Sequence, residues 1–419
     1  MKNSQIAATQ LSLPKGGGAI QGIGETFQSN EFTGTAALSI PIPTTPCRGF
    51  EPQLSVEYSS GGGNGIFGLG FNLSIPNISR KTSKGIPQYN ESDIFLFSNA
   101  EDLVPIIDGE PANIVNGYKI ITYRPRLEGL FAKIERWVNE KTQDSYWQVV
   151  SNDNVTSIFG KTEKARIFDP EDPKRIFQWL LQETFDAKGN RIVYEYEGEN
   201  SDNVRNNIYE KKYENNRCQT ANKYIQKIKY GNVQPFQPGQ VSQDNWLFEV
   251  VFDYGEYAID PNSSYEPIQY PKLPNRQDSF STYHAGFEIR THRLCRRILM
   301  FHNFQKLDKR PTLVHATCFN YQESAIVSLL NKVESVGYRY EQGNYQQKTL
   351  PPLEFKYTNF DTNFDTNKQG FLPLQEAGET GRDLPGLHLP PDYQLIDLYG
   401  EGIPGVLYSD GQATLYWEP

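Results

Sequence analysis

The chain has 419 residues, with 41 Lys and Arg against 50 Asp and Glu and a formal net charge of −9. This charge argues against nucleic acid as the main partner, because phosphate recognition needs a basic face. The 25 Tyr, 24 Phe, 34 Gly and 27 Pro are typical of short aromatic strands separated by turns, so the composition predicts an all-β chain.

The N-terminal residues 1–21 contain no apolar run of about seven residues, and we therefore expect no Sec signal peptide. No run of about 18 apolar residues occurs further along, which predicts that the chain does not insert directly into a membrane. The cysteines form no C-x-x-C pair, so we expect neither a disulfide framework nor a metal site; they are Cys47, Cys218, Cys295 and Cys318. These features predict folding in a reducing cytoplasm.

The stretch SSGGGNGIFGLGFNLSIP (residues 59–76) contains a literal G-x-G-x-x-G at Gly63, Gly65 and Gly68, and Gly70 follows. A dinucleotide-binding fingerprint needs a strand before the glycines and a helix after them, because the helix N-terminus holds the pyrophosphate. The preceding LSVEY alternates and predicts the strand, but the following LGFNLSIP also alternates and ends in proline. We therefore interpret these glycines as a structural connection between two strands, with no nucleotide cofactor.

Alternating runs with turn signals between them recur along the chain. They predict strands at residues 94–97, 118–123, 130–138, 146–150, 176–185, 191–196 and 247–254. A weak helical period appears at residues 325–332.

The segment TFDAKGNRIVYEY contains the most distinct hairpin signal. Asp186 opens the turn, Gly189 and Asn190 complete it, and Tyr194 and Tyr196 lie on one face of the second strand. The spacing resembles the tyrosine/aspartate (YD, or RHS) repeat. Stacked hairpins of this kind bury continuous aromatic stripes and build extended β-shells.

The run HRLCRR (residues 292–297) is the densest positive cluster of the chain. In a strand, alternate residues would share one face: Arg293, Cys295 and Arg297. We expect these arginines to pair with carboxylates of the same fold, such as Glu288, the alternative being contact with an acidic cargo or partner. His284 and His292 are too far apart along a strand to make a zinc site.

The C-terminal part predicts a separate unit. Residues 361–383 are polar and predict a linker, and a new unit is expected from 384 to 419. Its stretch DLYGEGIPGVLYSDGQATLYWEP resembles an FG-GAP-type propeller repeat. The calcium loop of such a repeat needs side-chain oxygens at alternating positions. Tyr399 and Gly405 occupy two of these positions, so we expect no calcium.

Three opening stretches closely resemble the start of the B components of insecticidal toxin complexes (Tc toxins) and of the virulence plasmid B protein (SpvB) family. They are LSLPKGGGAIQGIGETF, FTGTAALSIPIP and SVEYSSGGGNGIFGLGFNLSIPNISR. Further matches are RIFQWLLQETFDAKGNRIVYEY, SFSTYHAGFEIRTHRLCRRILMFHNF and LYGEGIPGVLY, so the resemblance covers essentially the whole chain. Phe71 departs from it, because the family's pattern N-G-x-x-G-x-G-W has Trp there.

The resemblance implies an RHS-like β-shell of antiparallel hairpins over residues 1–360, followed by the truncated start of a β-propeller. In Tc toxins the C component completes this shell and places a toxic segment inside it, and the propeller of the B component docks on the pore-forming A component. We therefore expect a non-enzymatic shell or translocation component, made in the bacterial cytoplasm and released with the toxin. Its expected partners are the C and A components.

Two other functions stay open. The chain could be the N-terminal secretion or targeting half of a virulence-plasmid-type toxin that lacks its ADP-ribosyltransferase domain, or a carbohydrate-binding surface module. Such a transferase needs an Arg, a Ser-Thr-Ser strand and a Glu-x-Glu turn. Glu195, Glu197 and Glu199 match the last element literally, but no Ser-Thr-Ser strand precedes them in suitable context. We therefore expect no catalytic residue.

Overall fold

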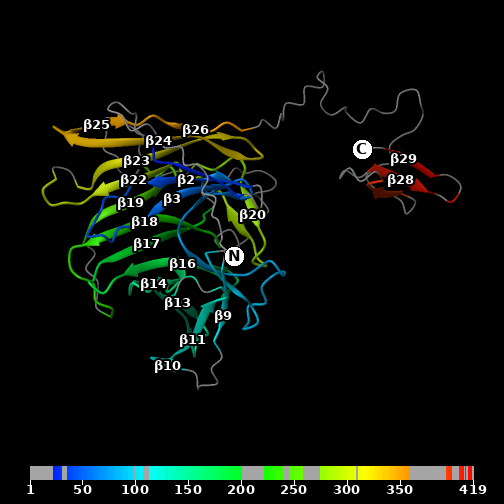
Figure 1. Cartoon of the computed structure of the whole chain (residues 1–419), viewed down its shortest axis with the longest axis horizontal. Helices are drawn as coiled ribbons and strands as arrows, with labels where there is room; N and C mark the ends of the chain where they lie inside the picture. Colours follow the sequence, from blue (N-terminus) through cyan, green and yellow to red (C-terminus); the bar gives the residue numbers. More distant parts are fainter. Residues whose placement is uncertain are drawn as a thin grey trace, which may run out of the picture. The chain divides into compact units, whose positions relative to one another are not determined.

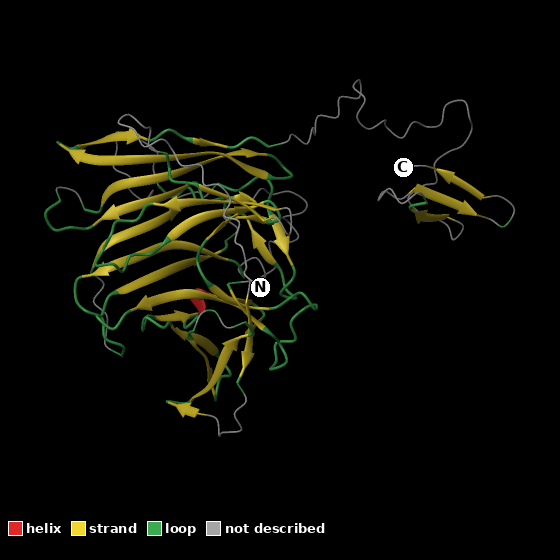
Figure 2. Cartoon of the chain, viewed as in Figure 1, coloured by secondary structure: helices red, strands yellow, loops and turns green. Residues whose placement is uncertain are grey.

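The computed structural model describes most of the chain as strands and turns. It describes residues 22–30, 35–98, 101–106, 113–127, 129, 131–200, 221–239, 245–257, 274–307, 310–357, 393–398, 405–409, 411 and 414–417. Within these ranges the single helical element is a short 3-10 turn, η1 (Glu163–Ala165), and every other regular element is a strand (Figure 2). The all-β prediction is confirmed. The same ranges contain no apolar helix long enough to cross a membrane.

The strands of the first compact unit, residues 1–356, pair almost entirely with neighbours in the chain. They are β1 (Thr26–Asn30), β2 (Thr35–Ile42), β3 (Leu54–Ser59), β4 (Asn64–Gly65), β5 (Gly68–Leu69), β6 (Phe71–Leu73), β7 (Asn77–Arg80), β8 (Phe95–Phe97), β9 (Glu101–Pro105), β10 (Asn113–Val115), β11 (Tyr118–Pro125), β12 (Lys133–Asn139), β13 (Ser145–Val150), β14 (Thr156–Phe159), β15 (Arg166–Asp169), β16 (Asp172–Phe185), β17 (Arg191–Gly198), β18 (Lys223–Asn232), β19 (Trp246–Asp253), β20 (Phe280–Thr282), β21 (Ile289–Thr291), β22 (Arg297–His302), β23 (Thr312–Glu323), β24 (Ser328–Glu341), β25 (Asn344–Thr349) and β26 (Leu353–Glu354).

The largest sheet has two parts that meet at β16. On one side a series of antiparallel pairs runs from β16 through β17, β18, β19, β22 and β23 to β24, whose far side pairs with β25 and β26. These strands lie above one another in Figure 1, with β25 and β26 at the end of the stack. This is the arrangement of consecutive hairpins that the sequence predicts.

On its other side β16 takes part in a closed ring of antiparallel strands. The ring passes from β7 to β8, β9, β11, β12, β13, β14 and β16 and returns to β7. Because the ring closes, each of its strands has a hydrogen-bonded neighbour on both sides. Below, we call this set of strands the closed ring; in Figure 1 several of its strands lie below β16.

The length of β16 allows it to serve both parts. Its residues Gln178–Leu180 pair with β7, while Glu183–Phe185 pair with β17. Its opposite side pairs with β14 and β15 through successive segments. One strand therefore belongs at the same time to the closed ring and to the long stack.

A smaller sheet of β1, β2, β3 and β6 packs against the long stack. Its Ile40, Val56 and Phe71 are all at most 1% exposed and belong to one apolar core. The stack contributes Phe248 and Ile298 to the same core. The largest cluster of buried apolar side chains therefore includes residues of the N-terminal sheet, the stack and the closed ring.

The second compact unit, residues 357–419, contains a three-stranded antiparallel sheet. Its strands are β27 (Tyr393–Ile396), β28 (Gly405–Ser409) and β29 (Thr414–Trp417). The predicted linker at 361–383 and the predicted start of the new unit at 384 lie outside the described residues. The assignment of a propeller to this unit stays a prediction.

Two local predictions are wrong. The helical period at residues 325–332 does not form a helix, because Ser324 N–H bonds the Val327 carbonyl at 3.1 Å in a turn and β24 begins at Ser328. The run 292–296 is not a strand either, since β21 ends at Thr291 and β22 begins at Arg297. There the backbone bonds the glycine-rich loop and β19, through Cys295 N–H to Ile66 O and Arg296 N–H to Asp253 O.

Candidate functional site

The glycine-rich loop forms a tight hairpin. The strands β4 and β5 pair with each other, and Phe67 between them is fully buried against Phe319, with ring centroids 5.2 Å apart. Gly68 and Gly70 have positive φ values of 84° and 81°, which favour glycine. The residues that follow form β6, so no helix N-terminus faces these glycines.

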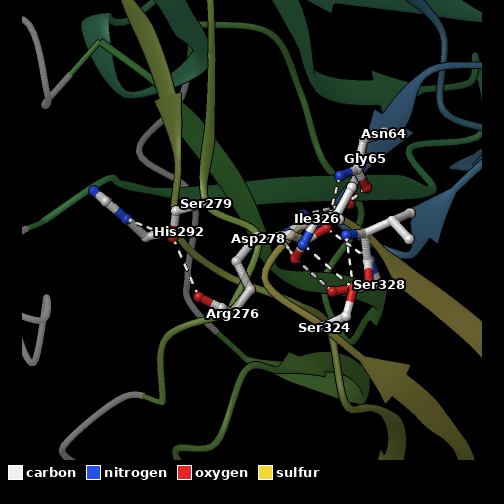
Figure 3. A network of polar contacts seen from close by, with 10 residues as sticks. Asn64, Gly65, Arg276, Asp278, Ser279, His292, Ser324, Ile326 and Ser328 are labelled. Atoms are coloured by element: carbon white, nitrogen blue, oxygen red, sulfur yellow. Dashed lines mark hydrogen bonds and ion pairs between the residues drawn. The ribbon is translucent and has the colours of Figure 1, made fainter. Parts of the chain in front are cut away.

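The loop is fixed by a buried carboxylate, Asp278 (Figure 3). Its side chain is 1% exposed and accepts two hydrogen bonds from Arg276, each at 2.8 Å. It also accepts from Asn64 Nδ2 at 2.8 Å, from Ser328 N–H at 2.7 Å and from Ser328 Oγ at 2.5 Å. We call these four residues the Asp278 network. It joins the glycine-rich loop, the segment before β20 and the start of β24.

Arg276 extends this network to the backbone of the loop. It donates to the Gly65 carbonyl at 2.8 Å and to the Asn64 side-chain oxygen at 2.7 Å, and its side chain is fully buried. Burial alone would raise the pKa of Asp278, but hydrogen bonds from Arg276, Ser328 and Asn64 outweigh it and hold that pKa well below its usual range. The carboxylate is therefore ionised and saturated with donors, an arrangement suited to holding three segments together.

His292 lies next to this network. It contacts Ser279 Oγ through Nδ1 at 3.1 Å (Figure 3), and its carbonyl accepts from Arg276 N–H. Burial lowers the pKa of His292 to about 3, helped by the charges of Arg290, Arg293 and Arg276. His284 lies elsewhere, in the turn between β20 and β21.

The three glutamates of the Glu-x-Glu matches are not arranged as one site. Glu195 pairs with Lys229 at 3.0 Å, and Glu197 is exposed. Glu199 is 3% exposed and accepts hydrogen bonds from the Tyr224 hydroxyl and from His292 N–H. Burial raises the pKa of Glu199, which the Tyr224 hydrogen bond opposes.

The arginines of the HRLCRR run pair with carboxylates of the fold, as the sequence predicts, although not with Glu288. Glu288 accepts from Ser281 instead. The observed pairs are Arg293 with Glu199, Arg296 with Glu323, and Arg297 with Asp253. These ion pairs give each of the three arginines a counter-charge within the fold.

The YD hairpin is held by its own turn residues. Asp186 accepts from the N–H of Lys188 and of Asn190, both at 2.9 Å, and from the Asn190 side chain at 2.8 Å. Gly189 has φ +80°, and a Cβ there would lie 2.9 Å from Pro235. Tyr194 and Tyr196 are each 8% exposed on the core face of β17. All of these groups contribute packing or turn geometry.

The described residues offer little else that resembles a reaction centre. They contain no group of three or more His, Cys, Asp or Glu side chains placed to hold a metal ion. One surface cavity of about 280 Å³ contains the ion pair of Arg166 and Asp144. Another, of about 620 Å³, is lined by Tyr338, Tyr340 and charged residues at the end of β24.

Comparison with known proteins points to one family. The model of the Salmonella virulence plasmid 65kDa B protein, SpvB, matches residues 30–304. The mono(ADP-ribosyl)transferase SpvB of Salmonella choleraesuis (strain SC-B67) is 37% identical over 348 residues, which cover 79% of this chain and 57% of that protein. The protein of the same name from Salmonella dublin is 37% identical over 344 residues, which cover 78% of this chain and 56% of that protein. The chain thus spans little more than half the length of these curated relatives.

Solved structures agree with this result. The N-terminal domain of effector protein SpvB from Salmonella typhimurium strain LT2 is similar with a TM-score of 0.67 and 36% identity, over 72% of this chain and 98% of that one. TcdB2-TccC3 is similar with a TM-score of 0.74 and 36% identity, over 98% of this chain and 20% of that one. The Photorhabdus luminescens Tc holotoxin pore is similar with a TM-score of 0.74 and 35% identity, over 99% of this chain and 19% of that one.

Replacing Gly70 by alanine tests the structural role of the loop. A Cβ at Gly70 would lie 2.6 Å from the Tyr58 ring and 2.9 Å from the Ser59 carbonyl, at a positive φ. We expect Gly70→Ala to lower the free energy of unfolding by about 2–4 kcal/mol. Gly63→Ala is the matched control, because nothing lies within 4 Å of a Cβ there. Equal stability of the two variants in denaturant titrations would contradict the structural role.

Removing the charge of Asp278 tests the network. Asp278→Asn leaves Arg276 buried without its counter-ion, and we expect a loss of about 3–5 kcal/mol in unfolding free energy. Asp172→Asn, at an exposed carboxylate, serves as the control and should change little.

The same residue gives a pH dependence. The pKa of Asp278 is lower in the folded than in the unfolded chain, so its stabilisation is complete above the unfolded pKa, about 4, and is lost as pH falls below it. The stability difference between wild type and Asp278→Asn should therefore shrink between about pH 5 and pH 2. A difference that grows on acidification would show that the assigned sign is wrong.

Proposed function

Because the chain belongs to the family of the Salmonella virulence plasmid 65kDa B protein, we propose that it is a non-enzymatic part of the β-shell of a bacterial toxin. In this role it forms a wall around a toxic cargo and takes part in its delivery. The observation that carries the proposal is the similarity to TcdB2-TccC3 over 98% of this chain, at a TM-score of 0.74. The proposed partners are a toxin-complex C component, which completes the shell, and a pore-forming A component.

The end of the long stack supports this role. The strand β25 pairs with β24 on one side, and five of its six residues are exposed. Lys348 is the one charged residue in the strand, and edge strands that carry few charges can accept a further strand. We propose that the shell continues from this end of the sheet, and that the chain leaves the bacterium as part of the toxin.

The glutamates and the histidine support a non-enzymatic role. Glu195 and Glu199 have partners within the fold, and burial lowers the pKa of His292 to about 3, which makes its imidazole a weak proton acceptor. The curated relatives are named mono(ADP-ribosyl)transferases, but the matched solved SpvB structure is an N-terminal domain. This supports the second candidate function, a secretion or targeting part of a toxin of that kind.

The groove beside Tyr338 and Tyr340 is the one observation that favours a carbohydrate-binding module. Tyrosine rings beside charged groups can stack on and hydrogen-bond a sugar. Saturable binding in a glycan array by the wild type, abolished by Tyr340→Ala, would favour this third candidate.

A proline in β25 tests extension of the shell. The hairpin between β24 and β25 turns at Gln342 and Gly343, both with positive φ, so the pair flanking the turn exchanges hydrogen bonds. Alternation then directs the N–H of Gln347 away from β24. We expect Gln347→Pro to leave the chain folded but to lower recovery of the complex at least tenfold when the chain is co-expressed with its C component and purified.

Gln347→Ala is the matched control, because it removes the same side chain and keeps the N–H. It should assemble like the wild type. If proline and alanine variants both assemble normally, β25 is not the edge at which the shell is extended.

A direct assay tests the absence of catalysis. The purified chain incubated with NAD should release no nicotinamide above the uncatalysed rate, and Glu197→Gln should behave identically. Nicotinamide release by the wild type that Glu197→Gln abolishes would overturn the non-enzymatic proposal.

A further inference from the structure

The inner side of the closed ring contains two buried arginines stacked on one aromatic ring. The guanidinium carbons of Arg80 and Arg136 each lie 5.0 Å from the centroid of the Phe95 ring. Arg80 is 4% exposed and Arg136 is 5% exposed. Two positive charges therefore lie close together in an apolar interior, where each needs a counter-charge.

The two arginines differ in how they are neutralised. Arg80 bonds Asp93 at 2.5 Å, and the Asp93 side chain is only 8% exposed. Arg136 has Glu91 as its ion-pair partner at 3.2 Å, and the Glu91 side chain is 71% exposed to solvent, which screens the pair. Burial lowers the pKa of Arg80, and the charge of Arg136 contributes to this shift. Arg80 therefore has a buried counter-charge, whereas the counter-charge of Arg136 lies at the solvent-exposed surface.

Two buried N–H donors beside Phe95 have no acceptor among the described residues. They are Arg136 Nε and Trp147 Nε1. The residues stand directly opposite each other on β12 and β13, and both contact Phe95. Trp147 is fully buried. In contrast, the nearby indole of Trp179 donates to the Ser145 carbonyl at 2.8 Å. Leaving a buried donor without an acceptor is costly, so a bound acceptor is expected.

The geometry points to a binding site for a small monovalent anion such as chloride, held by Arg136 Nε–H and Trp147 Nε1–H inside the closed ring. A water molecule could accept both hydrogen bonds, but its own two hydrogens would then need acceptors nearby. The aromatic rings packed around Trp147 are those of Phe95, Tyr123 and Trp179, and the Tyr123 hydroxyl is engaged in a side-chain hydrogen bond with Arg136. An anion needs donors alone, and it would add a buried counter-charge for Arg136 to the exposed one of Glu91. This site is independent of the proposed shell function.

Thermal unfolding of the full chain in different anions tests the site. At constant ionic strength, replacing sodium gluconate by sodium chloride should raise Tm by about 2–4 °C and then saturate, because a ligand that binds the folded state stabilises it by mass action. Trp147→Phe keeps the ring and removes the donor, so the chloride-dependent rise should disappear. Trp137→Phe, on the next strand position after Arg136, is the control and should keep the full rise.

Bromide identifies the position without relying on a variant that folds. Crystals of the wild-type chain grown in sodium bromide should show an anomalous difference peak within about 3.5 Å of both nitrogens. A chloride-independent Tm together with no bromide peak would overturn the proposal and would leave water as the acceptor. A bromide peak elsewhere, with none at Trp147, would also overturn it.

Discussion

The ionised carboxylate of Asp278 is the contact on which the arrangement of the N-terminal region depends. It gathers donors from Asn64, Arg276 and Ser328, which are far apart in the sequence. A buried charge is tolerated only when donors surround it, so these segments must fold together for any of them to be stable. The glycine-rich loop is thereby seated on β24 and on the segment before β20. The loop leads into the strand β6. It therefore does not offer a phosphate the backbone N–H groups of a helix N-terminus.

The same principle recurs in other parts of the first unit. Arg293 with Glu199, and Arg297 with Asp253, place charge pairs in a largely aromatic fold. The first pair joins segments that no described ladder connects, whereas the second lies across the ladder of β19 and β22, where Asp253 and Arg297 are opposite each other. Apolar burial supplies most of the stabilisation, whereas the buried pairs determine which segments meet. A wall of consecutive hairpins needs such cross-links, since neighbouring strands alone would fix only local order.

The sequence predicts the fold class and most strands because hydrophobic alternation is a local signal. It also predicts the turn at Gly189 and Asn190, where side-chain and φ requirements act within a few residues. The closed ring was not foreseen, because it depends on the pairing of β9 with β11 and of β7 with β16, contacts that no local pattern encodes. The Asp278 network was missed for the same reason: a carboxylate flanked by polar residues resembles any surface loop. The sequence feature that comes nearest to indicating the network is Arg276, two residues before Asp278. The run 292–296 does not form a strand because tertiary hydrogen bonds to Ile66 and Asp253 replace a ladder.

Hydrogen exchange on the wild type and on Asp278→Asn tests the central claim that this carboxylate joins the glycine-rich loop to the shell. Three amides are informative. The N–H of Gly70 bonds the Gly63 carbonyl within the loop, the N–H of Cys295 bonds the Ile66 carbonyl of the loop, and the N–H of Ser328 bonds Asp278 itself. The account predicts that all three lose protection together in the variant, by a larger factor than the amides of β12 in the closed ring. Loss of protection at Ser328 alone, with Gly70 and Cys295 unchanged, would contradict it.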